Sequence, residues 1–173
     1  KIARLPLRSG NPTGRRTEEA ARLVEAHGQA VYRLAYARTG SREDAEDITQ
    51  ETFLRLVRAA PVFRDEAHCR AWLLHVAMNC TRSLFRRPWR RRDLPLEEAA
   101  NTAVPDGERG DVLEAVLNLP ERYRAPVHLF YYEGLTVEQI AKILGLREGA
   151  VRTRLSRARG MLRDMLKEDE EHA

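Results

Sequence analysis

The segment that most constrains the fold of this chain lies near its C-terminus, at residues 135–163. It reads LTVEQIAKILGLREGAVRTRLSRARGMLR. Thr136 can cap the first turn of a helix, and Gln139, three residues later, can return a hydrogen bond to the backbone, which is the capping-box pattern. Gly145 suits the left-handed turn that ends a helix, and a second helix is predicted to begin near Glu148. Two short helices joined in this way form a helix-turn-helix, whose second helix lies in the DNA major groove in many DNA-binding proteins.

The second of these helices divides into two faces at about 100° per residue. One face is apolar and is predicted to pack inward: Val151, Leu155, Ala158, Leu162 and Leu166. The opposite face is polar and is predicted to point outward: Arg152, Thr153, Ser156 and Arg157. Arginine can bind both acceptors of guanine, and a small hydroxyl side chain can reach base edges. This pattern predicts a helix that reads duplex DNA.

Three further arginines, Arg154, Arg159 and Arg163, fall toward the flanks of the outward face. Contacts from the flank of a recognition helix usually go to phosphates, which position the protein without reading sequence. The alternative interpretation is a solvated basic face on a three-helix bundle. The capped turn before the helix favours DNA binding.

Helical periodicity recurs along the rest of the chain, and no segment alternates convincingly between apolar and polar residues. The hydrophobic content of 43% supports a buried core. The sequence therefore predicts an all-α fold of two small helical domains joined by a flexible linker. The predicted helices are residues 17–38, 41–60, 67–86, 111–118, 121–132, 136–144 and 148–166.

Prolines and glycines set the predicted domain boundaries. Residues 88–110 contain three prolines and two glycines, which is typical of a linker. The prediction divides the chain into five parts: a flexible leader at 1–16, a first domain at 17–92, an acidic linker at 93–110, a second domain at 111–167 and a solvated tail at 168–173.

The charge of the chain, +4 with an isoelectric point near 9.4, is unevenly distributed. One basic cluster contains five arginines between residues 86 and 92, and the last helix contains a second cluster. Residues 93–110 carry five acidic residues and one arginine. Two basic regions separated by an acidic connector indicate two contacts with a polyanion.

The predicted helix at 41–60 carries an acidic strip. Its core face is expected from residues at helical spacing: Ala45, Ile48, Thr52 and Leu56. Asp47, Gln50 and Glu51 lie on other faces, beyond the first turn in which the helix dipole alone would favour acidic side chains. Because DNA would repel this strip, it is predicted to dock on a basic protein surface.

The loop at 61–67 and the predicted helix at 67–86 form a second candidate nucleic-acid surface. Phe63, Arg64 and Asp65 lie in the loop. An aromatic side chain beside a basic helix can hold an unstacked base, although an ordinary connector has the same composition. The helix itself has a polar side formed by Asn79, Arg82 and Arg86. Its core residues are expected to include Trp72, Leu73, Val76 and Leu84.

Several classes of site are not indicated. Cys69 and Cys80 would lie about 16 Å apart along one helix, too far for a disulfide. His68 and His75 have no neighbours at zinc-ligand spacing, so no metal or cofactor is predicted. No Ser/His/Asp set or phosphate-binding loop indicates an enzyme. No signal peptide and no apolar run of membrane-spanning length is found, so no membrane insertion and a cytoplasmic location are expected.

Taken together, the segments resemble a bacterial RNA polymerase sigma factor of the extracytoplasmic-function group in the sigma-70 family. The resemblance covers approximately residues 20–166. Residues 44–56, DAEDITQETFLRL, are similar to region 2.2, and residues 71–79, AWLLHVAMN, are similar to regions 2.3 and 2.4. Residues 119–146 and 149–163 are similar to region 4. Arg147 departs from the pattern, because many relatives have a better helix cap there.

The resemblance implies a factor that binds core RNA polymerase and directs promoter-specific initiation. Asp47, Gln50 and Glu51 match positions that dock on the coiled coil of the β′ clamp. Region 4 implies contact with the β flap, and the linker is expected to follow the RNA path of polymerase. An anti-sigma factor is a further expected partner. The absence of a third domain is expected to exclude the larger variants of the group.

The resemblance also implies two contacts with promoter DNA. The loop residues Phe63, Arg64 and Asp65, together with Asn79, match the part of the family that captures a flipped base of the −10 element. Arg82 and Arg86 continue this surface along the helix. The −35 element would be read by the four outward side chains of the last helix, Arg152, Thr153, Ser156 and Arg157, with Arg154 and Arg159 beside them.

A second hypothesis is a stand-alone helix-turn-helix repressor or activator that binds duplex DNA as a dimer. It accounts for residues 111–166, but it assigns no role to the strip at 44–56 or to the basic cluster at 86–92. Transcription with purified core polymerase separates the two hypotheses, since only a sigma factor starts transcription by itself.

Overall fold

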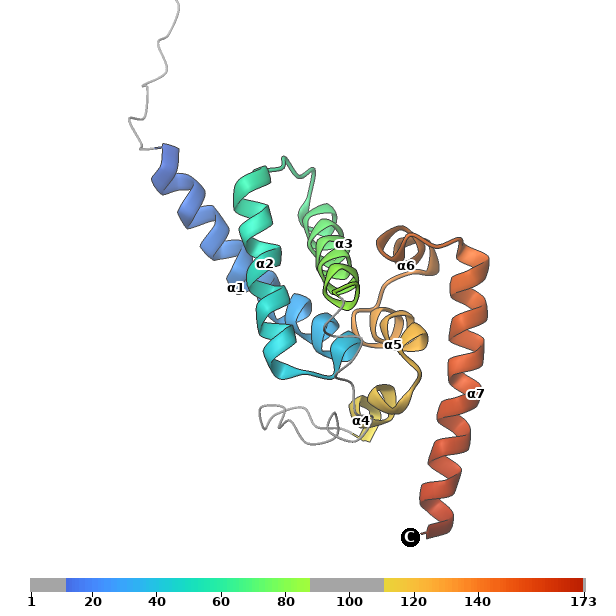
Figure 1. Ribbon diagram of the computed structural model, residues 1–173. Coiled ribbons are helices and arrows are strands. Elements are labelled where there is room, and N and C mark those ends of the chain that lie inside the picture. Colours follow the sequence, from blue (N-terminus) through green and yellow to red (C-terminus); the bar gives the residue numbers. More distant parts are fainter. Residues whose placement is uncertain (1–11, 88–110, 173) are drawn as a thin grey trace, which may run out of the picture.

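The computed structural model describes residues 12–87 and 111–172, and every regular element within these ranges is a helix, as the sequence predicts (Figure 1). The chain order is α1 (Pro12–Thr39), α2 (Arg42–Ala59), α3 (Glu66–Phe85), α4 (Asp111–Asn118), α5 (Glu121–Val127), the π-helical turn η1 (His128–Tyr132), α6 (Val137–Leu144) and α7 (Glu148–His172). The predicted acidic linker at 93–110 lies outside the described residues.

The two outer boundaries differ from the prediction. α1 begins at Pro12, so the predicted leader at 1–16 is wrong for its last five positions. Proline is well tolerated in the first turn of a helix because its missing N–H has no partner there in any case. α7 continues to His172, whereas the sequence predicts that this helix ends at residue 166. Glutamate, which is the commonest residue at this end of the chain, is a good helix former.

The first three helices form the N-terminal module, in which α1 packs against both α2 and α3. The turn between α1 and α2 follows the predicted pattern: Gly40 has a positive φ of 66°, and the Ser41 side chain accepts a hydrogen bond from the Asp44 N–H at 3.3 Å. The expected core face of α2 is buried: Ala45, Ile48, Thr52 and Leu56. The buried hydroxyl of Thr52 donates to the carbonyl of Ile48 at 2.7 Å, which satisfies it inside the core.

The core residues expected in α3 are also largely confirmed. Leu73, Val76 and Leu84 are buried, whereas Trp72 is only half-buried. The Trp72 ring is covered instead by Phe63 from the preceding loop, at a centroid distance of 5.8 Å. The aromatic contact therefore fixes the loop onto the first turns of α3.

The C-terminal module contains α4 to α7 and has the helix-turn-helix predicted from the sequence. Thr136 and Gln139 form both hydrogen bonds of the capping box, and Gly145 ends α6 in the left-handed conformation with φ 65°. Val151, Leu155 and Ala158 of α7 are buried as expected.

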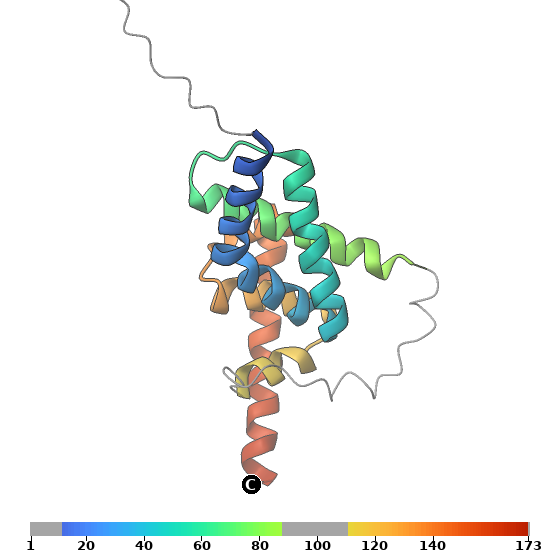
Figure 2. The ribbon, with the colours of Figure 1, turned by 90° about the vertical axis from the view of Figure 1, so that its left-hand side faces the viewer.

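The apolar face of α7 loses its cover toward the C-terminus. Leu162 is half-buried, and Leu166, predicted to lie inward, is 51% exposed. α7 projects beyond the other helices at this end (Figures 1 and 2). The inward prediction fails for Leu166 because the periodicity of the helix continues past the elements that could bury it.

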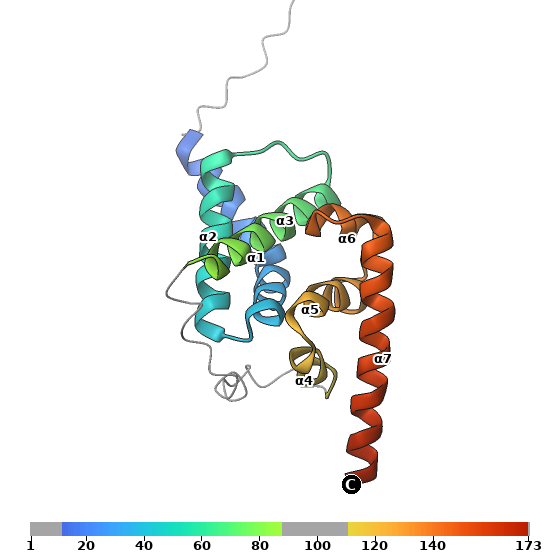
Figure 3. The ribbon, with the colours of Figure 1, turned by 45° about the vertical axis from the view of Figure 1, so that its right-hand side comes forward.

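The two modules pack against each other. α6 lies beside α3, and α5 contacts α1 (Figure 3). One hydrophobic cluster includes Leu34 of α1 and Leu74 and Met78 of α3 together with core residues of the C-terminal module such as Leu119 and Ile140. The N-terminal module thus supplies part of the core on which the helix-turn-helix rests.

Candidate nucleic-acid interface

The outward face of α7 is exposed at all four positions predicted to read DNA: Arg152, Thr153, Ser156 and Arg157. The guanidinium of Arg152 donates to the Glu148 carboxylate at 2.9 Å, and the Thr153 hydroxyl donates to the Gly149 carbonyl at 2.9 Å. Both contacts are made within the helix and leave the side chains at the surface. Because i,i+4 ion pairs at a helix surface are weak, Arg152 can exchange Glu148 for a base or a phosphate.

The flanking arginines are not equivalent. Arg159 and Arg163 are exposed, whereas Arg154 is half-buried and donates to the Arg122 carbonyl at 3.4 Å. Arg154 therefore also contributes to the contact between α7 and α5. Of the three, Arg159 and Arg163 are the more available for phosphate contacts.

The loop before α3 is ordered by its own side chains. Asp65 is the N-cap of α3, and its carboxylate accepts the backbone N–H of His68 at 2.7 Å. The Arg64 N–H donates to Nδ1 of His68 at 3.2 Å. Phe63 meets the His68 ring edge to face, with centroids 5.6 Å apart. Of the three predicted loop residues, Asp65 thus has a capping role that the sequence interpretation did not assign.

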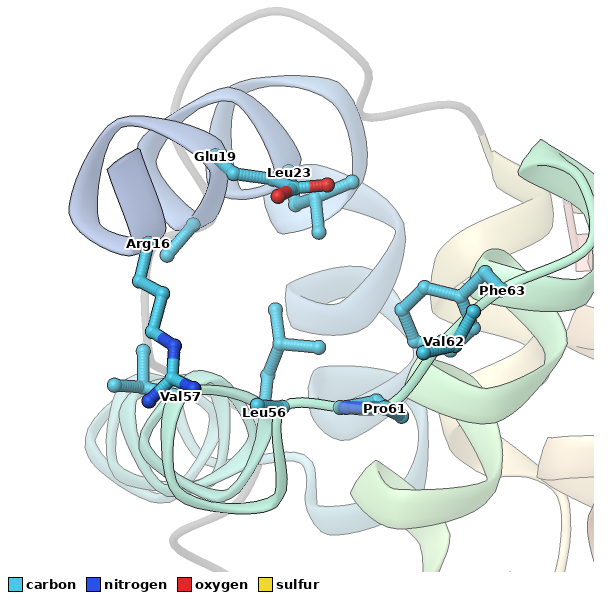
Figure 4. A pocket seen from close by; sticks show the side chains of 10 residues that line it. Arg16, Glu19, Leu23, Leu56, Val57, Pro61, Val62 and Phe63 are labelled. Atoms are coloured by element: carbon cyan, nitrogen blue, oxygen red, sulfur yellow. The ribbon is translucent and has the colours of Figure 1, made fainter. Parts of the chain in front are cut away.

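A hollow of about 390 Å³ opens between the first turns of α1, the last turn of α2 and the loop that follows (Figure 4). Its lining combines apolar side chains, among them Leu56 and Phe63, with the charged side chains of Arg16 and Glu19 on α1. Its volume falls at the lower end of the range of roughly 300–1,000 Å³ for ligand pockets. The apolar side chains could pack on the flat face of an unpaired base.

The predicted −10 residues form two groups rather than one site. Asp65 begins α3 and Asn79 lies fourteen positions later, so the two are separated by about 21 Å along the helix axis. A single extruded base cannot contact both the loop and Asn79. The surface is instead an extended track along α3, with Phe63 and Arg64 at one end and Arg86 at the other.

Two members of this track are engaged in the contact between the modules. Nη1 of Arg82 donates to the Asn79 side-chain oxygen at 3.1 Å, and Nη2 of Arg82 donates to the backbone carbonyl of Leu144 in α6. The Asn79 amide also contacts Nε2 of His75 at 3.1 Å. Asn79 and Arg82 are half-buried, whereas Arg86 is exposed.

The acidic strip of α2 lies at the surface as expected. Asp47 and Gln50 are exposed, and Glu51 is half-buried and binds Arg55 at 2.8 Å. Asp44, three residues before Asp47, is 3% exposed and belongs to the start of the helix. The three predicted docking residues therefore occupy one accessible stretch of α2.

One buried charged group was missed by the sequence interpretation. Glu133, directly after η1, is 6% exposed and meets Arg70 of α3, Arg33 of α1 at 3.6 Å and His128 at 3.2 Å. Burial by itself raises the pKa of a carboxyl. Hydrogen bonds from His128 and Arg70, with the charges of His128 and Arg33, outweigh burial and lower the pKa of Glu133 to about 2. No local pattern marks this residue, because its two arginine partners, Arg33 and Arg70, come from distant helices.

Within residues 12–87 and 111–172, no group of three or more His, Cys, Asp or Glu side chains could hold a metal ion, and no helix is long and apolar enough to cross a bilayer. Cys69 and Cys80 are both buried and both free, as their spacing predicts.

Each of the two modules matches its own family of known proteins. Residues 23–91 match the family Sigma-70 region 2, and residues 109–162 match the family Sigma-70, region 4. The ECF RNA polymerase sigma factor SigE of Mycolicibacterium smegmatis is 39% identical over 155 residues, which cover 83% of this chain and 60% of that protein. SigL of Mycobacterium tuberculosis, another ECF RNA polymerase sigma factor, is 34% identical and is matched over 84% of this chain and 88% of its own length. A further similar protein is the ECF RNA polymerase sigma factor BldN of Streptomyces coelicolor. The chain spans 60% of the length of SigE and 60% of the length of BldN.

Two solved structures share the fold. The sigma factor RpoE in complex with the anti-sigma factor NepR from Bartonella quintana has a TM-score of 0.70 and 23% identity, over 87% of this chain and 98% of that one. CnrH in complex with the cytosolic domain of CnrY has a TM-score of 0.63 and 28% identity, over 93% of this chain and 92% of that one.

Proposed function

The chain belongs to the extracytoplasmic-function group of the sigma-70 family, and we propose that it binds core RNA polymerase and directs promoter-specific transcription initiation. The proposal depends on one observation: the chain has two different exposed surfaces, one suited to DNA and one suited to a basic protein partner. An exposed DNA-reading face on α7 stands in one module, and an exposed acidic strip on α2 stands in the other. A DNA-binding module alone would not require the second surface.

The −35 element is read, in this proposal, by the exposed side chains of Arg152, Thr153, Ser156 and Arg157. They are supported by the capped start of α6 and the left-handed turn at Gly145, which set the angle at which α7 leaves the turn. Arg159 and Arg163 supply phosphate contacts beside them. Each bidentate arginine contact is worth about 1–3 kcal/mol of discrimination between bases.

The −10 element is held along α3. An extruded base enters the hollow beside Phe63, and the adjoining single strand follows the helix toward Asn79, Arg82 and Arg86. Extrusion of a base costs a few kcal/mol, which the contacts in the hollow must recover. The separation of the loop from Asn79 supports a track that binds several nucleotides.

Core polymerase is bound through Asp47, Gln50 and Glu51 on α2, with the β′ clamp coiled coil as the basic partner, and the C-terminal module contacts the β flap. An anti-sigma factor is a further proposed partner. The structural similarity to CnrH, which was solved with the cytosolic domain of CnrY, supports this part of the proposal. Members of this family regulate transcription, and we propose no catalytic role for the chain.

Run-off transcription with purified core polymerase tests the proposed function. The chain is expected to give specific starts when it is added to core polymerase that contains no other sigma factor. A stand-alone repressor or activator would bind promoter duplex but give no start in this assay. Absence of specific starts on genomic templates would therefore overturn the proposal in favour of that second hypothesis.

A further inference from the structure

Four arginines from four different helices lie close together where the two modules meet. They are Arg38 of α1, Arg82 of α3, Arg124 of α5 and Arg154 of α7, and together they form the arginine cluster. All four are half-buried. Within residues 12–87 and 111–172, one carboxylate lies within ion-pair distance of the cluster, that of Glu121, which is 2.6 Å from Arg38. Four cations therefore share one anion in this part of the protein.

The positive charges of the cluster act on one another. Burial lowers the pKa of Arg38 below its usual value, and the charge of Glu121 opposes this effect. The charges of Arg82, Arg124 and Arg154 lower the pKa of Arg38 further, because each disfavours another positive charge nearby. Burial also lowers the pKa of Arg124. The cluster thus holds positive charge that the described part of the chain does not balance.

Backbone carbonyls hold two of these side chains in place. Nε of Arg124 donates to the Leu119 carbonyl at 2.7 Å, and Nη1 of Arg154 donates to the Arg122 carbonyl at 3.4 Å. A carbonyl oxygen carries no net charge, so these bonds orient the guanidinium groups without neutralising them. Because the donors are already positioned, a ligand that binds them has less conformational entropy to remove.

Several guanidinium donors remain available to a ligand. A guanidinium has five N–H groups. In the described ranges, the two terminal nitrogens of Arg124 and Nη2 of Arg154 make no hydrogen bond. The Arg38 side chain is only 15% exposed, and its buried Nε has no hydrogen-bond partner there either. Charges and donors left unpaired in such positions cost free energy, and an anion with several acceptor oxygens would remove part of that cost.

Phosphate groups match this set of donors. The planar guanidinium group binds phosphate oxygens through two parallel hydrogen bonds. Several guanidinium groups in one cluster call for an anion with several charges, which a chain of two or three phosphates supplies. The backbone of duplex DNA can reach the exposed arginines of α7, Arg159 and Arg163, whereas the half-buried cluster is better suited to a small ion.

We propose that the arginine cluster binds a small polyphosphate anion at the junction of the two modules. Arg124 and Arg154 donate hydrogen bonds to its oxygens, and Arg38 and Arg82 contribute positive charge beside them. The anion is either free polyphosphate or the phosphate chain of a nucleotide, since both present the same oxygens. The inference goes beyond the proposed function, because this site requires neither polymerase nor promoter DNA.

Calorimetric titration of the full chain with sodium tripolyphosphate, at a fixed low ionic strength, tests this proposal. The wild-type protein is expected to bind one tripolyphosphate ion per chain. Arg124→Gln and, separately, Arg154→Gln should each lower the affinity by about tenfold, as expected when hydrogen bonds to a charged group are lost. Circular dichroism shows whether each variant is folded. Arg154→Gln removes only a long backbone bond, so it tests the site even if Arg124→Gln fails to fold.

Arg22→Gln is the matched control. Arg22 is exposed on α1, about 24 Å from Arg38 along the helix axis, so this variant removes the same charge outside the cluster. Its affinity for tripolyphosphate should stay within about twofold of wild type, since isolated exposed charges interact weakly. Titration with ATP in the absence of divalent cations separates the two sources of the anion. Affinity for ATP equal to or above that for tripolyphosphate indicates a nucleotide, and lower affinity indicates free polyphosphate.

Three results would overturn the proposal. The first is the absence of saturable tripolyphosphate binding to the wild-type protein. The second is an equal loss of affinity in Arg22→Gln and in the cluster variants, which would indicate diffuse attraction to a basic surface. The third is a loss of affinity for a random duplex in Arg124→Gln as large as the loss for tripolyphosphate, since the cluster would then contact the nucleic-acid backbone. Run-off transcription is not measured in these titrations, so failure of this site and failure of the proposed function are separate outcomes.

Discussion

The carboxylate of Glu133 in the C-terminal module bonds to the guanidinium of Arg70 in the N-terminal module, 63 positions earlier in the chain. The π-helical turn η1 places it there. The Glu133 N–H donates to the His128 carbonyl at 3.2 Å, five residues back, and the side chain returns to Nε2 of His128, also at 3.2 Å. Such wide turns within helices are frequent at functional positions. Here the turn places the buried carboxylate of Glu133 in one module next to the guanidinium of Arg70 in the other.

Replacement of this carboxylate is expected to destabilise the protein in a pH-dependent way. The pKa of Glu133 is lowered from 4.5 to about 2 in the folded chain, so the ionised form stabilises the fold. That stabilisation is fully present above pH 4.5 and is lost as the pH falls toward 2. Glu133→Gln should lower the free energy of unfolding by about 3–4 kcal/mol at neutral pH, since lowering the pKa from 4.5 to about 2 corresponds to about 1.4 kcal/mol for each unit.

Urea unfolding followed by circular dichroism, on wild type and Glu133→Gln in parallel, measures this difference. Other carboxyl groups titrate equally in both proteins, so the difference between them isolates Glu133. Glu138→Gln, which alters an exposed ion pair with Lys142, is a matched control with little expected effect. A difference that stays constant from neutral pH down to about pH 3 would contradict the assigned pKa shift.

The local features of the fold were predictable from the sequence because their causes are local. Thr136, Gln139 and Gly145 form a cap and a turn from residues within one short segment, and the structure has both as predicted. The exposed face of α7 follows from helical spacing alone. The failure at Leu166 has the same origin, since periodicity gives the face of a helix but not the length over which a neighbour covers it.

The contact between the modules could not be predicted in this way. Leu34, Leu74 and Met78 have the periodicity of ordinary core residues, and nothing in their spacing says that their neighbours come from the other module. In the sequence, Arg82 does not differ from other basic residues on the polar side of α3. Its partner, the Leu144 carbonyl, is a backbone group with no sequence signature. The sequence therefore indicates Asn79 and Arg82 as candidate −10 residues but does not reveal that they lie in the contact with α6.

The turn of the helix-turn-helix depends on the left-handed conformation of Gly145, with φ 65°. Gly145→Ala is expected to lower the free energy of unfolding by about 1 kcal/mol, because a β-carbon disfavours this conformation. Gly149→Ala is the matched control, since Gly149 lies in the first turn of α7 with open space around its added β-carbon. The control should be neutral or stabilising by up to about 1 kcal/mol. Equal losses in thermal unfolding of both variants would contradict the assigned role of the turn.

The acidic strip of α2 is expected to bind core polymerase. Gln50→Ala with Glu51→Ala should weaken binding by about 1–3 kcal/mol if these groups lie in the buried part of the interface. Glu46→Ala is the control, because Glu46 is an exposed acidic residue of the same helix that pairs with Arg42. The measurement is competition for labelled core polymerase. The docking role of Gln50 and Glu51 would be contradicted if the double variant bound core polymerase as tightly as wild type. It would also be contradicted if Glu46→Ala lowered the affinity to the same extent.

Phe63 is expected to stack on an extruded base of the −10 element. Phe63→Ala should reduce formation of the open promoter complex by about 1–3 kcal/mol, the usual worth of stacking on an aromatic side chain. Phe63→Leu keeps an apolar side chain against Trp72 but removes the aromatic ring, so it separates stacking from packing of the loop. Permanganate reactivity of −10 thymines reports opening, and −35 duplex binding should be unchanged. If Phe63→Leu opens promoters as well as wild type, the ring serves only to pack the loop.

Arg157 is fully available on the outward face of α7 and is expected to read a base of the −35 element. Arg157→Ala should lose about 1–3 kcal/mol of discrimination at one base pair, because a bidentate contact to guanine is lost there and nowhere else. Binding to a panel of duplexes with single substitutions, at fixed salt concentration, measures that loss position by position.

Arg163→Ala is the matched control, since this exposed arginine lies further along the helix and is expected to contact phosphate. The control should weaken binding to every duplex to the same extent and should reduce the dependence on salt. A uniform loss in Arg157→Ala would assign Arg157 to the phosphate backbone as well.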